Sequence, residues 1–418
     1  MFIRSVLIFA LVAFASARNV HSSLYKGTEA LWITCDNQEK LDFVLQYKGV
    51  PGFDFMKVTR LPEDNVHVLV SAQQALFFKR ALDDENISYH VVIDDFQRLI
   101  DEESQSQRTA RMKFFDGFSK SFDFTFFPRH EEINNYLTDV SNNNEHISLI
   151  NIGKSNQKRE MLGVKISSGG DKKKPAIFID AGIHAREWIA PTTALYVISQ
   201  LANATNKHLY ENVDWYILPQ INPDGYEYSH TDHRLWRKTR STSASKGCPG
   251  VDGNRNFGYK WMEVGASSNP CSDTFAGKTP FSEIETQNVR DFVLSKKGDI
   301  KIYLTFHCYG QYMLHPWGYT SSLPENEPTL KLVAQKAEKA LSAIRGTHYK
   351  IGSSTNVLYP AAGGSDDWVM AVGGADLSYT VELPGKSFVT PRSQILPVGV
   401  ETFEAIKVFG EYAAKTYV

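Results

Sequence analysis

Short runs of hydrophobic residues near the N-terminus predict a small unit of four strands and two helices. Apolar and β-branched residues form the strand-like runs, and two stretches between them have the spacing of an amphipathic helix. In chain order they are 30–34 (strand), 38–46 (helix), 53–58 and 66–70 (strands), 72–83 (helix) and 89–93 (strand). The order β-α-β-β-α-β predicts a small α+β ferredoxin-like sandwich that can fold alone.

A polar segment follows this unit. A helical stretch at 94–103 leads into residues 104–111, which lack aliphatic anchors and carry Arg108 and Arg111. Exposed polar segments of this kind are preferred sites of proteolysis. We therefore expect a connector that a trypsin-like protease can cut after one of these two arginines.

From about residue 120 the pattern changes to longer apolar strands that alternate with helices. The strand-like runs are 176–180, 215–219, 302–306 and 377–381, and the helical stretches are 190–202, 282–295, 330–345 and 398–413. Strands that are apolar on both faces are typical of sheets covered by helices. The pattern predicts an α/β domain with a mixed, mostly buried sheet flanked by helices. In such sheets, functional sites form beyond the carboxyl ends of the strands.

The first 17 residues have the features of a secretory signal. Arg4 precedes the apolar run 6–14, and residues 15–17 form an A-x-A arrangement. The run is shorter than the 18 or more apolar residues expected of a membrane-spanning helix. We therefore expect a secreted, extracellular protein without a membrane anchor. Two sequons, at Asn86 and Asn203, fit this route.

Composition narrows the classes of function. The 418 residues carry 45 Lys and Arg against 47 Asp and Glu, and this net charge of -2 offers no general attraction for nucleic acid or an anionic membrane. Four cysteines are too few for a fold held mainly by disulfides. Hydrophobic cores must therefore supply the stability, and a local site must select the ligand.

A candidate metal site follows the run 176–180. His184 and Glu187 are three positions apart, so one turn can direct an imidazole and a carboxylate to the same point. His307 follows the run 302–306, at the end of another predicted strand. Ligands of the types His, Glu and His leave one position for water, which is the arrangement of catalytic zinc sites.

Longer motifs carry a family resemblance. They are 184–187 (His-Ala-Arg-Glu), 222–226 (Asn-Pro-Asp-Gly-Tyr), 235–240 (Leu-Trp-Arg-Lys-Thr-Arg), 250–257 (Gly-Val-Asp-Gly-Asn-Arg-Asn-Phe), 307–309 (His-Cys-Tyr) and 359–368 (Tyr-Pro-Ala-Ala-Gly-Gly-Ser-Asp-Asp-Trp). In this order they resemble the digestive zinc metallocarboxypeptidases of the A/B type. Residues 90–103 are similar to the end of that family's activation domain. Residues 383–386, Leu-Pro-Gly-Lys, look more like an insect gut member than a pancreatic one.

The resemblance implies a catalytic centre. It implies one zinc ion per catalytic domain, held by His184, Glu187 and His307, with Asp252 orienting His184. It implies Glu382 as the general base, which takes a proton from the attacking water and passes it to the leaving amine.

Further implied roles concern the substrate. Arg240 is expected to stabilise the developing oxyanion. The residues expected to bind the peptide are Asn254, Arg255 and Tyr359 for its C-terminal carboxylate, and Arg186 and Tyr309 for residues further along it. A site for a free carboxylate explains exopeptidase action, because an internal peptide bond offers none.

Asp366 carries the expectation about specificity. In the family, the residue at this position lies at the base of the pocket for the terminal side chain, where an acidic residue favours Lys or Arg. A buried carboxylate left unpaired penalises apolar side chains. Ser354 and Gly318 are small enough to leave room for a long side chain. We therefore expect a carboxypeptidase B-like preference.

The hypothesis is a secreted digestive zymogen, expected in the gut lumen. Its predicted parts are a signal (1–17), an activation pro-domain with its connector (18–111) and a zinc carboxypeptidase domain (112–418). The resemblance implies peptides with a free C-terminal carboxylate, an activating trypsin-like protease and protein carboxypeptidase inhibitors as partners. It also implies a Cys248–Cys271 bridge, with Cys35 and Cys308 free.

Three alternatives remain open at this point. One is an A-type preference for apolar C-terminal residues on the same fold. Another is a catalytically inactive secreted binding protein. The third is a serine hydrolase, which the missing nucleophile elbow disfavours.

Overall fold

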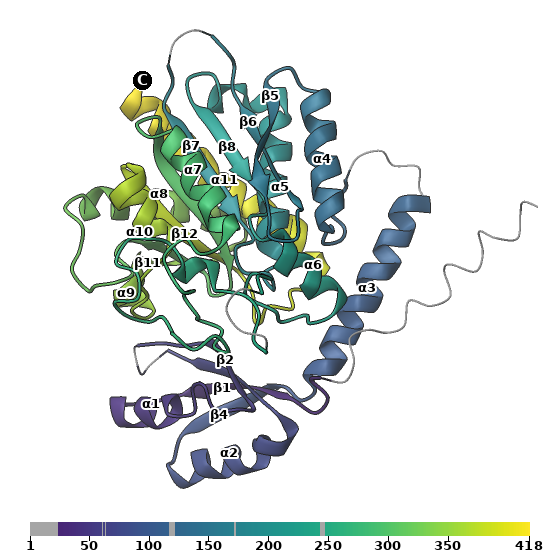
Figure 1. Ribbon diagram of the computed structural model, residues 1–418, viewed down its shortest axis with the longest axis vertical. Coiled ribbons are helices and arrows are strands. Elements are labelled where there is room, and N and C mark those ends of the chain that lie inside the picture. Colours follow the sequence, from purple (N-terminus) through teal and green to yellow (C-terminus); the bar gives the residue numbers. More distant parts are fainter. Residues whose placement is uncertain (1–23, 61, 63, 117–121, 171–172, 243–246) are drawn as a thin grey trace, which may run out of the picture.

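The computed structural model describes residues 24–116, 122–170, 173–242 and 247–418, apart from residues 61 and 63 (Figure 1). The predicted signal, residues 1–17, lies outside the described residues. A small N-terminal unit and a large C-terminal unit are joined by one long helix, α3 (Phe96–Asp116). No helix in the described ranges is long and apolar enough to cross a bilayer.

The N-terminal unit, which we call the pro-domain, has the predicted order of elements. They are β1 (Glu29–Thr34), α1 (Gln38–Leu45), β2 (Phe53–Lys57), β3 (Val66–Val70), α2 (Ala72–Asp84) and β4 (Ser88–Ile93). Its strands form an antiparallel sheet in the order β2-β3-β1-β4. Leu31, Val68 and Phe78 pack in a hydrophobic core between this sheet and the two helices. This confirms the ferredoxin-like prediction.

The predicted connector is helical. Residues 104–111 continue α3 without interruption, so the helix is twice as long as the pattern at 94–103 indicates. Phe96, Ile100 and Ala110 are buried on one side of it, whereas Arg108 is exposed on the other. The burial of this one face explains why a polar segment is ordered as a helix. In Figure 1, α3 leaves the pro-domain and extends along the side of the larger unit.

The C-terminal unit is built on an eight-stranded mixed sheet. The strands are β5 (Ile147–Lys154), β6 (Glu160–Ile166), β7 (Ala176–Ala181), β8 (Asp214–Leu218), β9 (Ile300–Cys308), β10 (Tyr312–His315), β11 (Lys350–Ser353) and β12 (Leu377–Leu383). Their order is β11-β10-β12-β9-β7-β8-β6-β5. The central strands β8, β7, β9 and β12 are parallel. β6 is antiparallel to both β5 and β8, and β10 is antiparallel to β12 but parallel to the edge strand β11.

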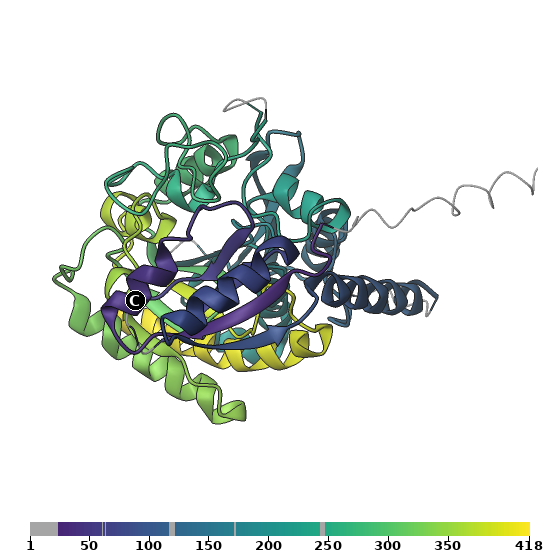
Figure 2. The same cartoon turned by 90° about the horizontal axis from the view of Figure 1, so that it is seen from below.

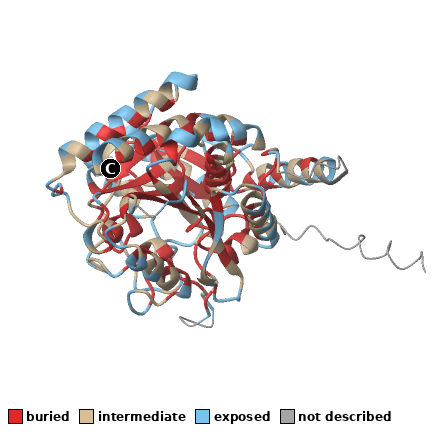
Figure 3. Cartoon of the chain, turned by 90° about the horizontal axis from the view of Figure 1, so that it is seen from above, coloured by how far each residue is buried: buried red, intermediate tan, exposed pale blue. Residues whose placement is uncertain are grey.

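Helices cover both faces of this sheet. They are α4 (His130–Asn142), α5 (Ile189–Ala202), α6 (Pro223–Thr231), α7 (Ile284–Ser295), α8 (Glu327–Arg345), α9 (Ser354–Val357), α10 (Ser365–Trp368) and α11 (Ile395–Tyr417), with the short turns η1 (Ala204–Leu209), η2 (Gly253–Arg255), η3 (Val369–Gly373) and η4 (Arg392–Gln394). Along β7, Ile177 and Ile179 face a core shared with α5, α8 and α11, and Ala176 and Phe178 face one shared with α7. Figure 3 shows the buried residues gathered in the sheet and the exposed residues on the outer sides of the helices. The predicted fold class is confirmed.

The pro-domain lies across the end of the large sheet where β9 terminates. Figure 2 shows its strands and helices in front of the larger unit when the molecule is seen from below. His67 on β3 is 3.0 Å from the hydroxyl of Tyr309, which follows β9 directly. This is the sheet end at which the sequence predicts the functional site.

Cysteine pairing follows the prediction. Cys248 and Cys271 form a disulfide, and Cys35 and Cys308 are buried free thiols. The bridge closes a loop of mostly irregular structure that contains η2.

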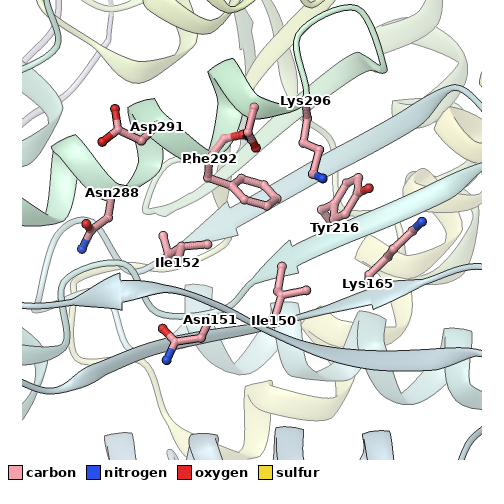
Figure 4. A pocket seen from close by; sticks show the side chains of 10 residues that line it. Ile150, Asn151, Ile152, Lys165, Tyr216, Asn288, Asp291, Phe292 and Lys296 are labelled. Atoms are coloured by element: carbon pink, nitrogen blue, oxygen red, sulfur yellow. Dashed lines mark hydrogen bonds between the residues drawn. The ribbon is translucent and has the colours of Figure 1, made fainter.

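A groove on another side of the molecule holds none of the predicted site residues. It lies between α7 and the strands β5, β6 and β8, and Figure 4 shows the side chains that line it. The lining residues are Ile150, Asn151, Ile152, Lys165, Tyr216, Asn288, Asp291, Phe292, Ser295 and Lys296. The candidate chemistry lies instead under the pro-domain.

Candidate active site

A tight turn after β7 carries two of the candidate metal ligands. β7 ends at Ala181, and the next residues lead into the turn with His184 and Glu187. Gly182 has a φ of +73°, and a Cβ atom there would lie 2.5 Å from the side chain of Gln220. Only glycine adopts this conformation in so little space, so the turn is fixed by its sequence.

Neighbouring strands position the next two candidates. β9 and β12 are parallel, and their register pairs His307 with Glu382. Side chains in register on adjacent strands project to the same face of a sheet. His307 thereby reaches the turn after β7, where its Nδ1 lies 3.1 Å from Nδ1 of His184.

His184, Glu187 and His307 form a buried cluster. Glu187 Oε1 lies 2.8 Å from His184 Nδ1, and Glu187 Oε2 lies 3.2 Å from His307 Nδ1. One donor atom from each residue lies within 4.8 Å of the other two. The side chains that the sequence predicts as metal ligands are therefore brought together.

The donor atoms of this cluster fit a zinc ion. His184 Nε2 lies 3.2 Å from Asp252 Oδ1, so the tautomer with its proton on Nε2 donates to Asp252 and turns the Nδ1 lone pair into the cluster. Two imidazole nitrogens and a carboxylate are ligands that zinc prefers, and three protein ligands leave a position for substrate or water.

Ionisation of the cluster is perturbed in a way that couples metal and proton binding. Burial and the charge of Arg237 lower the pKa of His184. Although burial opposes it, the two histidines hold the pKa of Glu187 below its ordinary value. Burial alone would lower the pKa of His307, but the charge of Glu187 raises it to about 9. Protons and a metal compete for the same atoms, so metal binding releases protons.

Glu382 lies beside the cluster with a free oxygen. Its Oε2 is buried without a hydrogen-bond partner in the described part of the chain. Burial raises the pKa of Glu382 to about 8, with a further contribution from the charge of Glu187. A carboxyl group of this kind is suited to take up and return a proton near neutral pH.

The structure places Arg240 away from the cluster. Its guanidinium stacks over two aromatic rings, 3.6 Å from the centroid of Tyr228 and 4.5 Å from that of Trp236. Arg237 lies at the cluster instead and donates to Asp252 Oδ2 through Nη2 (2.8 Å) and Nε (3.1 Å). The candidate for oxyanion stabilisation is therefore corrected from Arg240 to Arg237.

No signal in the sequence separated these two arginines. Residues 233–240 form neither helix nor strand, so periodicity does not indicate which side chain faces the site. A backbone hydrogen bond from Ala185 N–H to the carbonyl of Arg237 (3.0 Å) fixes Arg237, rather than Arg240, beside the turn after β7.

Two predicted carboxylate-binding residues follow Asp252 in η2. Asp252 Oδ1 accepts a hydrogen bond from the backbone N–H of Asn254 (3.0 Å), so one carboxylate connects this turn to His184. Arg255 donates through Nε to the carbonyl of Gly265 (3.0 Å) and through Nη1 to that of Asn254 (2.8 Å). These bonds hold the guanidinium in one orientation.

Tyr359 and Asp366 lie on the segment between β11 and β12. Tyr359 lies against the pro-domain, where the Lys48 ammonium is 5.9 Å from the centroid of its ring. Asp366 is buried at the start of α10, where its Oδ2 accepts from the hydroxyl groups of Thr380 (3.1 Å) and Ser354 (3.5 Å). Within the described residues, these partners of the Asp366 carboxylate are hydroxyl groups, and no ion pair joins it to a cation.

Arg186 and Tyr309 lie where the pro-domain covers the site. Arg186 packs over the Phe388 ring, and its Nη1 lies 3.7 Å from Asp54 on β2. Tyr309 bonds to His67 of the same domain. Both residues predicted to bind upstream parts of a peptide are thus occupied by the pro-domain.

Comparison with known proteins agrees with this geometry. Residues 133–405 match the zinc carboxypeptidase family, and residues 31–103 match the carboxypeptidase activation peptide. The chain belongs to the zinc carboxypeptidase family. It is a hydrolase of the exopeptidase type with an activation peptide, and the family implies a zinc cofactor.

Relatives of this carboxypeptidase carry both A and B names. It is 48% identical over 302 residues to carboxypeptidase B of Astacus astacus, covering 71% of this chain and 99% of that protein. It is similar to the crystal structure of carboxypeptidase A from Helicoverpa armigera, with a TM-score of 0.87, 29% identity and coverage of 94% and 99%. Bovine thrombin-activatable fibrinolysis inhibitor in complex with tick carboxypeptidase inhibitor gives a TM-score of 0.66 at 36% identity, covering 70% and 99%.

Proposed function

We propose that this carboxypeptidase is a secreted digestive zymogen whose active form removes C-terminal Lys and Arg from peptides. The observation that carries the preference is the buried carboxylate of Asp366, which has hydroxyl groups as partners. A buried carboxylate without a cation is costly, and a Lys or Arg side chain of the substrate would supply the missing charge. The 48% identity to a carboxypeptidase B supports the same preference.

The proposed chemistry assigns one task to each group around the cluster. His184, Glu187 and His307 would hold the zinc ion, which supplies Lewis-acid chemistry toward a peptide carbonyl and water. Glu382 would take the proton of the attacking water and return it to the leaving amine. Arg237 would stabilise the charge that develops on the carbonyl oxygen.

Asn254, Arg255 and Tyr359 are proposed to bind the terminal carboxylate of the substrate. The guanidinium of Arg255 can form two parallel hydrogen bonds with a carboxylate, which fixes both position and orientation. An internal peptide segment offers no carboxylate at this point. The enzyme would therefore act on the last residue of a chain.

The preference is tested with matched peptides that differ only in the last residue. Activated enzyme is expected to release Lys and Arg at least about 100-fold faster, in kcat/KM, than Phe or Leu, because a buried charge without its partner costs about 3 kcal/mol. Asp366→Ser should reverse this order, whereas Asp376→Ser, a half-exposed acid outside the site, should leave it unchanged. Faster release of Phe or Leu by the parent enzyme would contradict the proposal.

Activation is proposed to occur by cleavage in the connector, residues 104–111, either after Arg108 or after Arg111, the last residue of the part 18–111. Arg108 is exposed, whereas Arg111 donates to Glu132 (2.8 Å) and to the carbonyl of Phe127 (3.2 Å). This difference supports cleavage after Arg108. Peptidase activity should rise after trypsin treatment, and N-terminal sequencing of the product identifies the bond.

Zinc dependence has its own test. A chelator should abolish the activity of the activated enzyme, and added zinc should restore it. Retained activity after complete removal of the metal would contradict the assignment. A protein inhibitor of carboxypeptidases is expected to bind the activated form, and the pro-domain should block such binding in the zymogen.

A further inference from the structure

Two surface sequons take no part in the proposed catalytic machinery. They are Asn86-Ile87-Ser88 on the pro-domain and Asn203-Ala204-Thr205 on the catalytic domain. Asn86 and Asn203 are both exposed, as are Ser88 and Thr205. An N-linked glycan requires this placement, because the bulky sugar must extend into solvent.

The backbone around Asn203 is arranged as a closed turn. Asn203 Oδ1 accepts hydrogen bonds from the backbone N–H of Thr205 (3.0 Å) and from the Thr205 hydroxyl (2.9 Å). The amide of Asn203 and the hydroxyl of Thr205 are therefore in direct contact, while Asn203 caps η1. The amide nitrogen is left to point away from these bonds, so it can carry a substituent without breaking the cap.

Asn203 is also remote from the proposed active site. Its helix, α5, begins two residues after Glu187 and continues for 14 residues before Asn203 caps its end. At 1.5 Å per residue this separation is about 20 Å along the helix. A glycan on Asn203 would extend from the opposite end of the sheet and leave the substrate path open.

Asn86 lies in a tight turn on the pro-domain. The turn connects α2 to β4, and Asn86 adopts a φ of +51°, which asparagine tolerates better than most residues. Its backbone is held by bonds of its N–H to Asp83 (3.0 Å) and of its carbonyl to the Lys40 ammonium (2.8 Å). The backbone is thus fixed while the side chain remains exposed.

We propose that both Asn86 and Asn203 carry N-linked glycans, so that activation removes one glycan with the pro-domain and leaves the other on the active enzyme. The proposal rests on the proposed secretion, which takes the chain through the glycosylating compartment. Neither site touches the cluster of His184, Glu187 and His307. The zymogen would therefore carry two glycans and the activated enzyme one, with no change at the catalytic cluster.

The experiment uses the full chain expressed in a eukaryotic secretory cell. Residues 1–17 are replaced by an established signal peptide in one version and kept in another. Ser88→Ala and Thr205→Ala remove the sequons without altering either asparagine. Ser88→Thr and Thr205→Ser keep them and serve as matched controls.

Treatment with peptide N-glycosidase should increase the electrophoretic mobility of the parent zymogen by two steps, one for each glycan removed. Each alanine variant should shift by one step. The two control variants should behave like the parent, and trypsin-activated enzyme should shift by one step, which Thr205→Ala abolishes. Absence of either step in the parent would overturn the two-site proposal. The version with the established signal peptide tests glycosylation whether or not residues 1–17 direct secretion. The version that keeps residues 1–17 tests secretion, and its failure to be secreted would count against the proposed secretion alone.

Discussion

The buried ion pair between Glu103 and Arg234 should decide whether the zymogen stays latent. Glu103 lies on α3, and Arg234 lies in the catalytic domain close to Arg186. Arg234 donates to Glu103 through Nε (2.5 Å) and Nη2 (3.0 Å), and the side chains are 1% and 6% exposed. Burial raises the pKa of Glu103 even though Arg234 opposes the shift. The charge on Glu103 is therefore tolerated only while Arg234 is present.

Glu103→Gln leaves the guanidinium of Arg234 buried without a carboxylate. Removal of one partner from a buried pair costs about 3 to 5 kcal/mol. The carbonyl groups of Arg186 and Phe388 still accept hydrogen bonds from Arg234, so we take the lower figure. A cost of about 3 kcal/mol weakens docking of the pro-domain by roughly 100-fold.

The assay is peptide hydrolysis by the intact zymogen, expressed as a fraction of its activity after trypsin. This fraction should rise about 100-fold in Glu103→Gln. Glu102→Gln is the matched control, because Glu102 is 67% exposed and its contact with Arg98 is 3.9 Å long. Trypsin-activated samples should be equally active, since the pro-domain has been removed from all of them. A Glu103→Gln zymogen that is as latent as the parent would refute the reasoning.

Three further outcomes test the site and the stability of the fold. Arg237→Gln should lower kcat/KM by about 100-fold or more, as loss of an oxyanion donor does, whereas Arg240→Gln should change it by less than about threefold; equal effects of the two would restore Arg240 as the candidate. Burial raises the pKa of Glu285 from 4.5 to about 7, so the folded protein binds this proton more tightly than the unfolded chain does. The resulting stabilisation is fully present below pH 4.5 and is lost as the pH rises through 7. Glu285→Gln should therefore remove up to ~3 kcal/mol of the decline in unfolding free energy between pH 4 and 8, measured by urea unfolding, and parallel pH profiles of the parent and the variant would contradict this. Replacing Cys248 and Cys271 by Ser should lower the free energy of unfolding by about 3 kcal/mol, because their bridge closes a separation of 23 residues, and an unchanged midpoint would count against this loop-entropy argument.

Local periodicity was sufficient to predict the pro-domain. Its strands are short runs rich in apolar and β-branched residues, and its two helices have apolar residues at helical spacing. Every observed bound lies within one residue of the expected one. The connector was harder to predict. Its helix depends on burial of Ala110 and on contacts such as that of Gln107 Oε1 with the backbone N–H of Phe127 (3.0 Å), which are distant in sequence.

The same distinction applies to the candidate site. His184 and Glu187 are neighbours on one turn, and His307 ends a recognisable strand, so their convergence could be expected from the sequence. The choice of Arg237 over Arg240 depends on a hydrogen bond to Ala185, about 50 positions away. Sequence spacing predicts where side chains on helices, strands and their adjoining turns lie. The positions of side chains on irregular segments depend on tertiary contacts.

Ion pairs across the domain interface show why the net charge of the chain says little about its latency. In the described part of the chain the pairs are Asp54–Arg186, Asp64–Lys350, Glu103–Arg234 and Arg111–Glu132, and the first three have their carboxylate on the pro-domain or on α3. In the first two, the carboxylate or the ammonium is about 40% exposed, so salt screens them and each contributes at most about 1 kcal/mol. The side chains of Arg111 and Glu132 are about a quarter exposed, so of these pairs only Glu103–Arg234 is shielded from water. Apolar packing of Met56, Leu69 and Phe96 against the catalytic domain also does not depend on charge screening. Concentrated salt should therefore leave the zymogen latent, whereas loss of Glu103 should not, because among the ion pairs at the interface this one is buried.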